Sequence, residues 1–108
     1  MDASFAVSSH RSGKCEVIEL AGELDMASAP RLEAVLDRML VIPDQIVVDA
    51  ERLTFIDSSG LRLLLRASQL VEGRIRLQGC SQQIARVFDI AGLSAAFTLE
   101  EATASSAS

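Results

Sequence analysis

The chain is 108 residues long, with 49% apolar residues, 23% charged residues and a formal net charge of −5 at pH 7. A chain of this size and composition forms one globular domain, and its acidic balance, without a cluster of basic residues, argues against direct nucleic-acid binding. Apolar runs fall far short of the roughly 20 residues that cross a bilayer, and the N-terminus lacks a secretion signal. We therefore expect a cytoplasmic protein that does not insert into membranes.

We expect a single domain over residues 1–108, with a core from about residue 4 to residue 101. Only Ala, Ser and Thr follow from residue 102 onward, so 102–108 is predicted to be a flexible tail. The first elements expected are a strand over 5–7, a hairpin turn over 11–14, a strand over 15–21 and a loop over 22–25.

A helix is predicted after this loop. Ser28 is expected to cap it by accepting a backbone N–H with its hydroxyl, and Pro30 suits its first turn. The apolar residues repeat at helical spacing up to Pro43, where the helix is expected to end: Leu32, Val35, Leu36, Met39 and Leu40.

The second half of the chain alternates strands with helices. The β-branched run 46–48 predicts a central strand over 45–49 that is covered on both faces, and 50–56 is expected to be a connection. A largely buried helix follows, with a polar strip at Arg62, Arg66 and Gln69. The last expected elements are a strand over 74–78, a helix between Ser81 and Gly92, and a strand over 97–99. The pattern predicts an α/β domain with an open mixed sheet of about four or five strands and three to four helices.

The stretch 57–61, Asp-Ser-Ser-Gly-Leu, begins the apolar second helix with a carboxylate and two hydroxyls. Unpaired N–H groups at a helix start donate hydrogen bonds to oxygen acceptors and favour negative charge, so this position would tolerate a phosphate on either serine. Ordinary helix capping explains the same residues, and this physical argument alone favours capping.

Four segments of the chain match one protein family in order and spacing. They are Gly-Glu-Leu-Asp at 22–25 with Ala-Pro-Arg-Leu at 29–32, Ile-Val-Val-Asp at 46–49, Leu-Thr-Phe-Ile-Asp-Ser-Ser-Gly-Leu at 53–61, and Val-Phe-Asp-Ile-Ala-Gly-Leu at 87–93. On these residues the chain resembles a STAS domain, and the Asp-Ser-Ser-Gly core resembles the anti-sigma factor antagonist branch of that family.

The resemblance implies a phosphorylation-switched binding protein. In that branch an anti-sigma factor, itself a serine kinase, phosphorylates a serine at this helix start, and the matching residue is Ser58. Unphosphorylated antagonist binds the anti-sigma factor and releases the sigma factor, whereas the phosphorylated form does not bind until a serine phosphatase restores it. Ser59 is the second choice, because sequence physics alone does not separate the two neighbours.

The resemblance also suggests a partner-binding surface. We expect Asp25 and Asp57 to lie near each other in loops beside the Ser58 helix, although each also fits a helix-capping role. The full set of expected partner-binding residues is Asp25, Asp57, Ser58, Ser59, Gly60, Leu61, Arg62, Arg66 and Gln69.

Residues for other activities are sparse. His10 is the only histidine and Lys14 the only lysine, a Gly-x-Ser-x-Gly elbow is absent, and no metal-ligand spacing occurs. We expect no catalytic residue, no metal and no cofactor. Two alternatives remain open: a STAS subunit that binds the ATPase of a lipid transporter, and a scaffold subunit of a stress-sensing complex.

Overall fold

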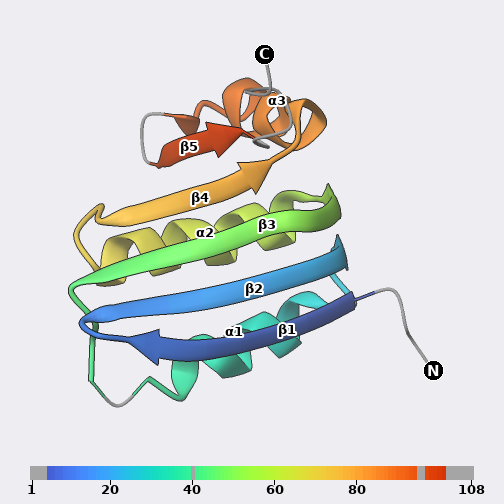
Figure 1. The fold of residues 1–108 in the computed structure, drawn as a ribbon. Helices are drawn as coiled ribbons and strands as arrows, with labels where there is room; N and C mark the ends of the chain where they lie inside the picture. Colours follow the sequence, from blue (N-terminus) through green and yellow to red (C-terminus); the bar gives the residue numbers. More distant parts are fainter. Residues whose placement is uncertain (1–4, 40, 95–96, 102–108) are drawn as a thin grey trace.

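The computed structural model describes residues 5–39, 41–94 and 97–101, which form five strands and three helices (Figure 1). The elements, in chain order, are β1 Phe5–Ser12, β2 Cys15–Leu24, α1 Ala29–Asp37, β3 Gln45–Ile56, α2 Ser58–Leu70, β4 Ile75–Cys80, α3 Gln82–Ile90 and β5 Thr98–Glu101. This arrangement confirms the expected α/β domain with an open mixed sheet.

The strands lie in the sheet in chain order, β1-β2-β3-β4-β5. β1 and β2 form an antiparallel hairpin, and β2 to β5 run parallel to one another. Each helix therefore connects two neighbouring parallel strands, and every such step moves across the sheet in the same direction. Right-handed crossovers then place the helices on a single face, and α1 and α2 lie behind the sheet in Figure 1.

The core lies between that face of the sheet and the helices. Inward-facing strand residues such as Ile18, Val48 and Leu77 are fully buried, and they share one cluster with Leu64 of α2 and Phe88 of α3. Phe88 also meets the ring of Phe97 edge-on, with the ring centroids 5.1 Å apart. This cluster packs the helices against the sheet and thereby fixes where each helix begins relative to the strand before it.

Helices do not cover both faces of β3, contrary to the expectation from its β-branched run. On the outer face of the sheet, Glu19, Glu51 and Gln78 are exposed, and within the described residues no helix covers them. Val47 is still only 7% exposed there, with Val17 and Arg76 as its register neighbours on the adjacent strands. Flanking side chains therefore bury this valine without a second helix layer.

Three strands are longer than the sequence indicates. β1 spans Phe5–Ser12 rather than residues 5–7, so Arg11 and Ser12 belong to the strand and not to the predicted turn over 11–14. β3 continues through residues 50–56, which were expected to be a connection, and β2 continues through residues 22–24, which were expected to be a loop. Their pairing contains two register shifts, between Glu19 and Ala21 and between Gly22 and Glu23. Such irregularities break the period-two alternation, and so the sequence pattern concealed these strand ends.

The helix boundaries agree with the prediction at the start of α3 but not at the end of α1. α3 begins after Ser81, whose Oγ accepts the Ile84 N–H at 3.2 Å. It ends at Ile90, and Gly92, with a φ of 76°, follows two residues later. α1 ends at Asp37, well before Pro43, because the following Met39 N–H bonds to the Leu36 carbonyl in a tighter turn. Residues 102–108 and Leu40 lie outside the described residues. Among the described helices, none is long and apolar enough to cross a membrane.

Candidate functional site

The start of α2 is held by one carboxylate. Asp57 has extended backbone dihedrals, and its Oδ1 accepts the N–H groups of Ser59 and Gly60 at 2.8 and 3.2 Å. Because these N–H groups have no partner inside the helix, the carboxylate satisfies them and its charge suits the positive end of the helix. The expected capping role of Asp57 is confirmed.

The turn that precedes α1 is built differently from the prediction. Ser28 has helical dihedrals and makes no side-chain cap bond to the helix; its hydroxyl instead donates to the Glu23 carbonyl at 2.7 Å. Asp25 takes the capping role, since its Oδ1 accepts the N–H groups of Ala27 and Ser28, both at 3.0 Å. The Asp25 N–H in turn donates to the Ser28 Oγ at 2.9 Å, giving a reciprocal capping pair.

The two acidic turns lie side by side, as the sequence predicted. The second carboxylate oxygen of Asp57, Oδ2, accepts the Met26 N–H at 3.2 Å, and the Asp57 N–H donates to the Leu24 carbonyl at 3.1 Å. Asp57 therefore joins the β2–α1 loop to the first turn of α2. These two segments, 24–28 and 57–61, form one edge of the molecule at the carboxyl ends of β2 and β3.

The structure distinguishes the two neighbouring serines. Ser58 is exposed, and within the described residues its hydroxyl makes no hydrogen bond, whereas Ser59 is half-buried in the first turn. The hydroxyl of Ser58 is therefore presented to solvent at the start of α2. This difference in exposure was not readable from two adjacent serines in the sequence.

Gly60 and Leu61 lie beneath this surface. Both are buried, and a Cβ on Gly60 would stand 2.7 Å from the Leu24 Cγ and 2.9 Å from the Ile56 Cγ1. The absence of a side chain lets α2 approach the ends of β2 and β3 closely. These two residues position the turn, and in this conformation they do not offer side chains to a partner.

The expected strip on α2 is only partly free. Arg62 and Gln69 are exposed, and Arg62 has no ion-pair partner among the described residues. Arg66 instead reaches α1, where its guanidinium lies 2.6 Å from the Asp37 carboxylate and 3.5 Å from that of Glu33. Arg66 therefore links α2 to α1 across the helix layer.

Two apolar residues of this edge were missed by the sequence analysis. Met26, in the β2–α1 loop, is 76% exposed, and Phe55, two residues before Asp57, is 48% exposed. Large apolar side chains held in solvent beside a polar turn are typical of protein-binding surfaces. Phe55 lies in the stretch 50–56, which was expected to be a connection, so the sequence did not predict that it lies at the end of a strand.

The chain is similar to known proteins over most of its length. The family model described as "Mlab, STAS domain" matches residues 7–101. The chain belongs to the STAS domain family. A curated relative, the anti-sigma-B factor antagonist of Staphylococcus aureus (strain NCTC 8325 / PS 47), is 33% identical over 90 residues, which cover 80% of this chain and 83% of the relative.

Solved STAS structures resemble the chain over nearly its whole length. The anti-sigma factor antagonist SpoIIAA in its unphosphorylated form is 26% identical, with a TM-score of 0.75 over 93% of this chain and 92% of that chain. The Bacillus cell fate determinant SpoIIAA in the phosphorylated form is 27% identical, with a TM-score of 0.66 over 93% of this chain and 96% of that chain. The same backbone frame thus occurs in proteins studied in both phosphorylation states.

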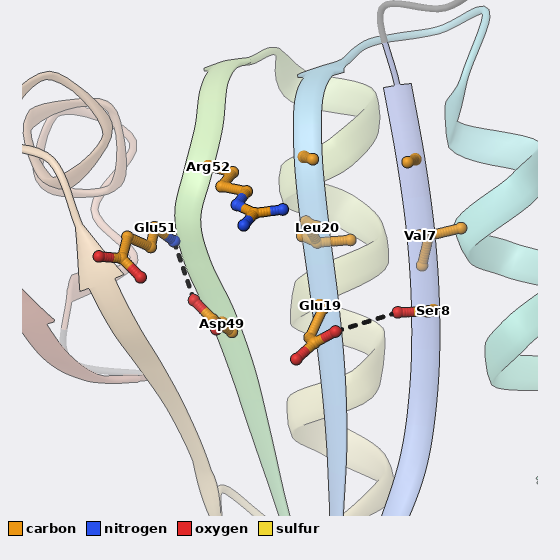
Figure 2. A pocket seen from close by; sticks show the side chains of 9 residues that line it. Val7, Ser8, Glu19, Leu20, Asp49, Glu51 and Arg52 are labelled. Atoms are coloured by element: carbon orange, nitrogen blue, oxygen red, sulfur yellow. Dashed lines mark hydrogen bonds between the residues drawn. The ribbon is translucent and has the colours of Figure 1, made fainter.

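This STAS domain also has a hollow on the outer face of its sheet (Figure 2). The hollow has a volume of about 290 Å³, and its lining includes Glu19, Asp49, Glu51 and Arg52. Glu19 accepts the Ser8 hydroxyl at 3.2 Å, and Asp49 accepts the Glu51 N–H at 3.0 Å. None of the residues 57–61 lines it, and so it is not part of the site described above.

The Ser58 hydroxyl has neither a histidine nor a metal-binding cluster beside it in the part of the chain that the structure describes. His10 lies on β1 with Val17 as its register partner, near the opposite end of β2 from Leu24, so it cannot serve Ser58 as a base. Within the described residues there is also no group of three or more His, Cys, Asp or Glu side chains that could hold a metal ion. The arrangement leaves Ser58 exposed at the start of α2.

Proposed function

We propose that this STAS domain is an anti-sigma factor antagonist controlled by phosphorylation of Ser58. Its unphosphorylated form binds an anti-sigma factor that is a serine kinase, and it thereby releases a sigma factor. The kinase phosphorylates Ser58 and ends binding, and a serine phosphatase restores the binding form. The protein is then a cytoplasmic substrate and binding partner that makes no direct contact with nucleic acid.

The observation that carries the proposal is the position of Ser58. Its exposed hydroxyl has no hydrogen bond within the described residues, and it lies at the first residue of a helix that favours negative charge. A kinase can therefore reach the hydroxyl without unfolding the turn, and the folded state can hold the product. The relatives named anti-sigma-B factor antagonist and SpoIIAA support the same role.

The surroundings of Ser58 explain why phosphate would end binding. The exposed apolar residues Met26, whose N–H bonds to Asp57, and Phe55, at the end of β3, would bury surface against a partner. A phosphate adds about −1.5 to −2 charges at neutral pH, and a partner that covers Ser58 would have to desolvate them. The neighbouring carboxylates of Asp25 and Asp57 already make this edge anionic, so an added dianion also meets like charge.

A binding experiment tests the switch directly. Wild-type protein and the variants Ser58→Ala and Ser58→Asp are used to capture proteins from a lysate of the source cell, and the captured proteins are identified by mass spectrometry. We expect wild type and Ser58→Ala to retain an ATP-binding serine kinase and Ser58→Asp to lose it. Retention of the same kinase by Ser58→Asp at full yield would contradict the switch.

Phosphate mapping assigns the residue independently of any mimic. The captured kinase and ATP are incubated with wild type, Ser58→Ala and Ser59→Ala. We expect phosphate on wild type and Ser59→Ala but not on Ser58→Ala. The reverse result would move the site to Ser59, which is half-buried in this structure.

The same capture distinguishes the alternatives that the family resemblance left open. A STAS subunit of a lipid transporter would retain a transporter ATPase with wild type and Ser58→Asp alike. A scaffold subunit of a stress-sensing complex would retain further STAS proteins in stable stoichiometry. Either result would replace the proposed function.

A further inference from the structure

A second surface lies at the opposite end of the sheet from Ser58. There, the end of α1 and the β1–β2 hairpin enclose a shallow groove of about 360 Å³ whose apolar lining consists of Val35, Met39 and Val41. Val41 is 67% exposed and the adjacent Ile42 is 55% exposed. Two neighbouring large aliphatic side chains in solvent beside an apolar groove are unusual for a surface that stays free.

The loop that presents these side chains is anchored on both sides. The Arg11 guanidinium donates to the Val41 carbonyl at 3.0 Å, and the Asp44 N–H donates to the Lys14 carbonyl at 2.9 Å. Arg74 donates to the Asp44 carbonyl as well. These bonds hold the backbone at Val41 and at Asp44, on either side of Ile42, which lowers the entropic cost of binding a partner.

The rim of the groove is cationic. Arg11 and Arg38 line it together with a single acidic residue, Glu16, whose carboxylate is already paired with Arg11 at 2.9 Å. Arg38 is exposed and has no ion-pair partner among the described residues. In a chain with a net charge of −5, an apolar groove with an unpaired arginine selects for a partner that carries carboxylates.

We propose that this groove and the side chains of Val41 and Ile42 form a second protein-docking surface for an amphipathic segment with aliphatic and acidic side chains. Eight residue steps along β2 separate Glu16 in the groove from Leu24 beside Asp57, which places the two surfaces roughly 25 Å apart. The segment can therefore bind whether or not Ser58 carries a phosphate. The proposal does not depend on the identity of the Ser58 partner.

Site-specific photo-crosslinking tests the surface. The photoreactive residue benzoylphenylalanine replaces Ile42 in the full chain, and in a matched control it replaces Ile90, a 78% exposed isoleucine at the end of α3. After irradiation in source-cell lysate, crosslinked peptides are sequenced by mass spectrometry. We expect a specific protein product at position 42 but not at position 90, with aliphatic and acidic residues at the point of attachment.

Further variants show whether the groove and its charge are responsible. We expect Arg38→Glu to lower the yield at position 42 at least about fivefold, through repulsion of the acidic segment. Val41→Ser is expected to lower it as well, and Ser58→Asp to leave it unchanged. The proposal is overturned by equal yields at positions 42 and 90, by insensitivity to both groove variants, by loss with Ser58→Asp, or by attachment to lipid or to a second copy of this chain.

Discussion

The Asp57 Oδ2 accepts the Met26 N–H at 3.2 Å, and this hydrogen bond joins two loops that are 31 residues apart in sequence. The other oxygen of the same carboxylate holds the first turn of α2. One side chain therefore sets both the start of the Ser58 helix and the position of the exposed Met26. The site edge depends on this carboxylate for its shape before any partner arrives.

Replacement of Asp57 tests this double role. We expect Asp57→Ala to lower the free energy of unfolding by about 1–2 kcal/mol, because it leaves the helix-start N–H groups and the Met26 N–H without their acceptor. Asp57→Asn keeps one acceptor oxygen, and its free energy of unfolding should fall less than that of Asp57→Ala. Urea unfolding followed by circular dichroism measures both changes. Asp89→Ala, at an exposed carboxylate of α3, is the control, and an equal loss in the control would refute the capping role.

Gly60 tests the close approach of α2 to the sheet. In an ordinary helix Gly→Ala stabilises by up to about 1 kcal/mol, but here the added Cβ would stand 2.7 Å from the Leu24 Cγ. We expect Gly60→Ala to destabilise the protein by about 1–3 kcal/mol through overpacking. Gln69→Ala, at an exposed position of the same helix, should be neutral or slightly stabilising in the same urea titration. Unchanged stability of Gly60→Ala would show that Leu24 and Ile56 yield to the new methyl group.

A negative charge at Ser58 should not unfold the protein. We expect Ser58→Asp to change the free energy of unfolding by less than about 1 kcal/mol, because the helix start favours an anion while Asp57 beside it opposes one. Gln69→Asp places the same charge in the last turn of α2, where the helix dipole disfavours it, and should be the less stable variant. Thermal unfolding of the two variants makes the comparison. If Ser58→Asp were the less stable of the two, its loss of binding would have to be attributed partly to misfolding.

The Arg66 ion pairs are expected to contribute little to stability. Arg66, Asp37 and Glu33 have side chains that are 42%, 55% and 52% exposed, so water and salt screen their attraction. We expect Arg66→Gln to lower the free energy of unfolding by less than about 1 kcal/mol in dilute buffer and to leave it nearly unchanged at about 1 M salt. Arg62→Gln, without an ion-pair partner among the described residues, serves as the matched control. A larger loss that persists in high salt would indicate that the aliphatic part of Arg66 packs between the helices.

Much of the fold was predictable because local patterns agree with the tertiary structure. The periodic apolar residues of α2, the Ser81 cap and the Gly92 terminator each mark their element through interactions within a few residues. The full extent of β3 was not predictable. Register shifts against β2 place Ala50, Leu53 and Ile56 in the core at a spacing of three residues. A regular strand would bury every second residue, so this spacing does not predict a strand.

The sequence by itself determined the α/β class, the family resemblance and the candidate serines at the start of α2, since each depends on residue types at fixed spacing along the chain. Only the tertiary structure decided that Ser58 is exposed and Ser59 half-buried, that Asp25 rather than Ser28 caps the turn into α1, and that Met26 lies beside Asp57. These features arise from contacts between segments far apart in sequence or from the direction in which a side chain leaves a turn. Local periodicity encodes neither property. The contact between Met26 and Asp57 depends on how the ends of β2 and β3 meet the first turn of α2, and the Asp25 cap depends on the conformation of its own turn.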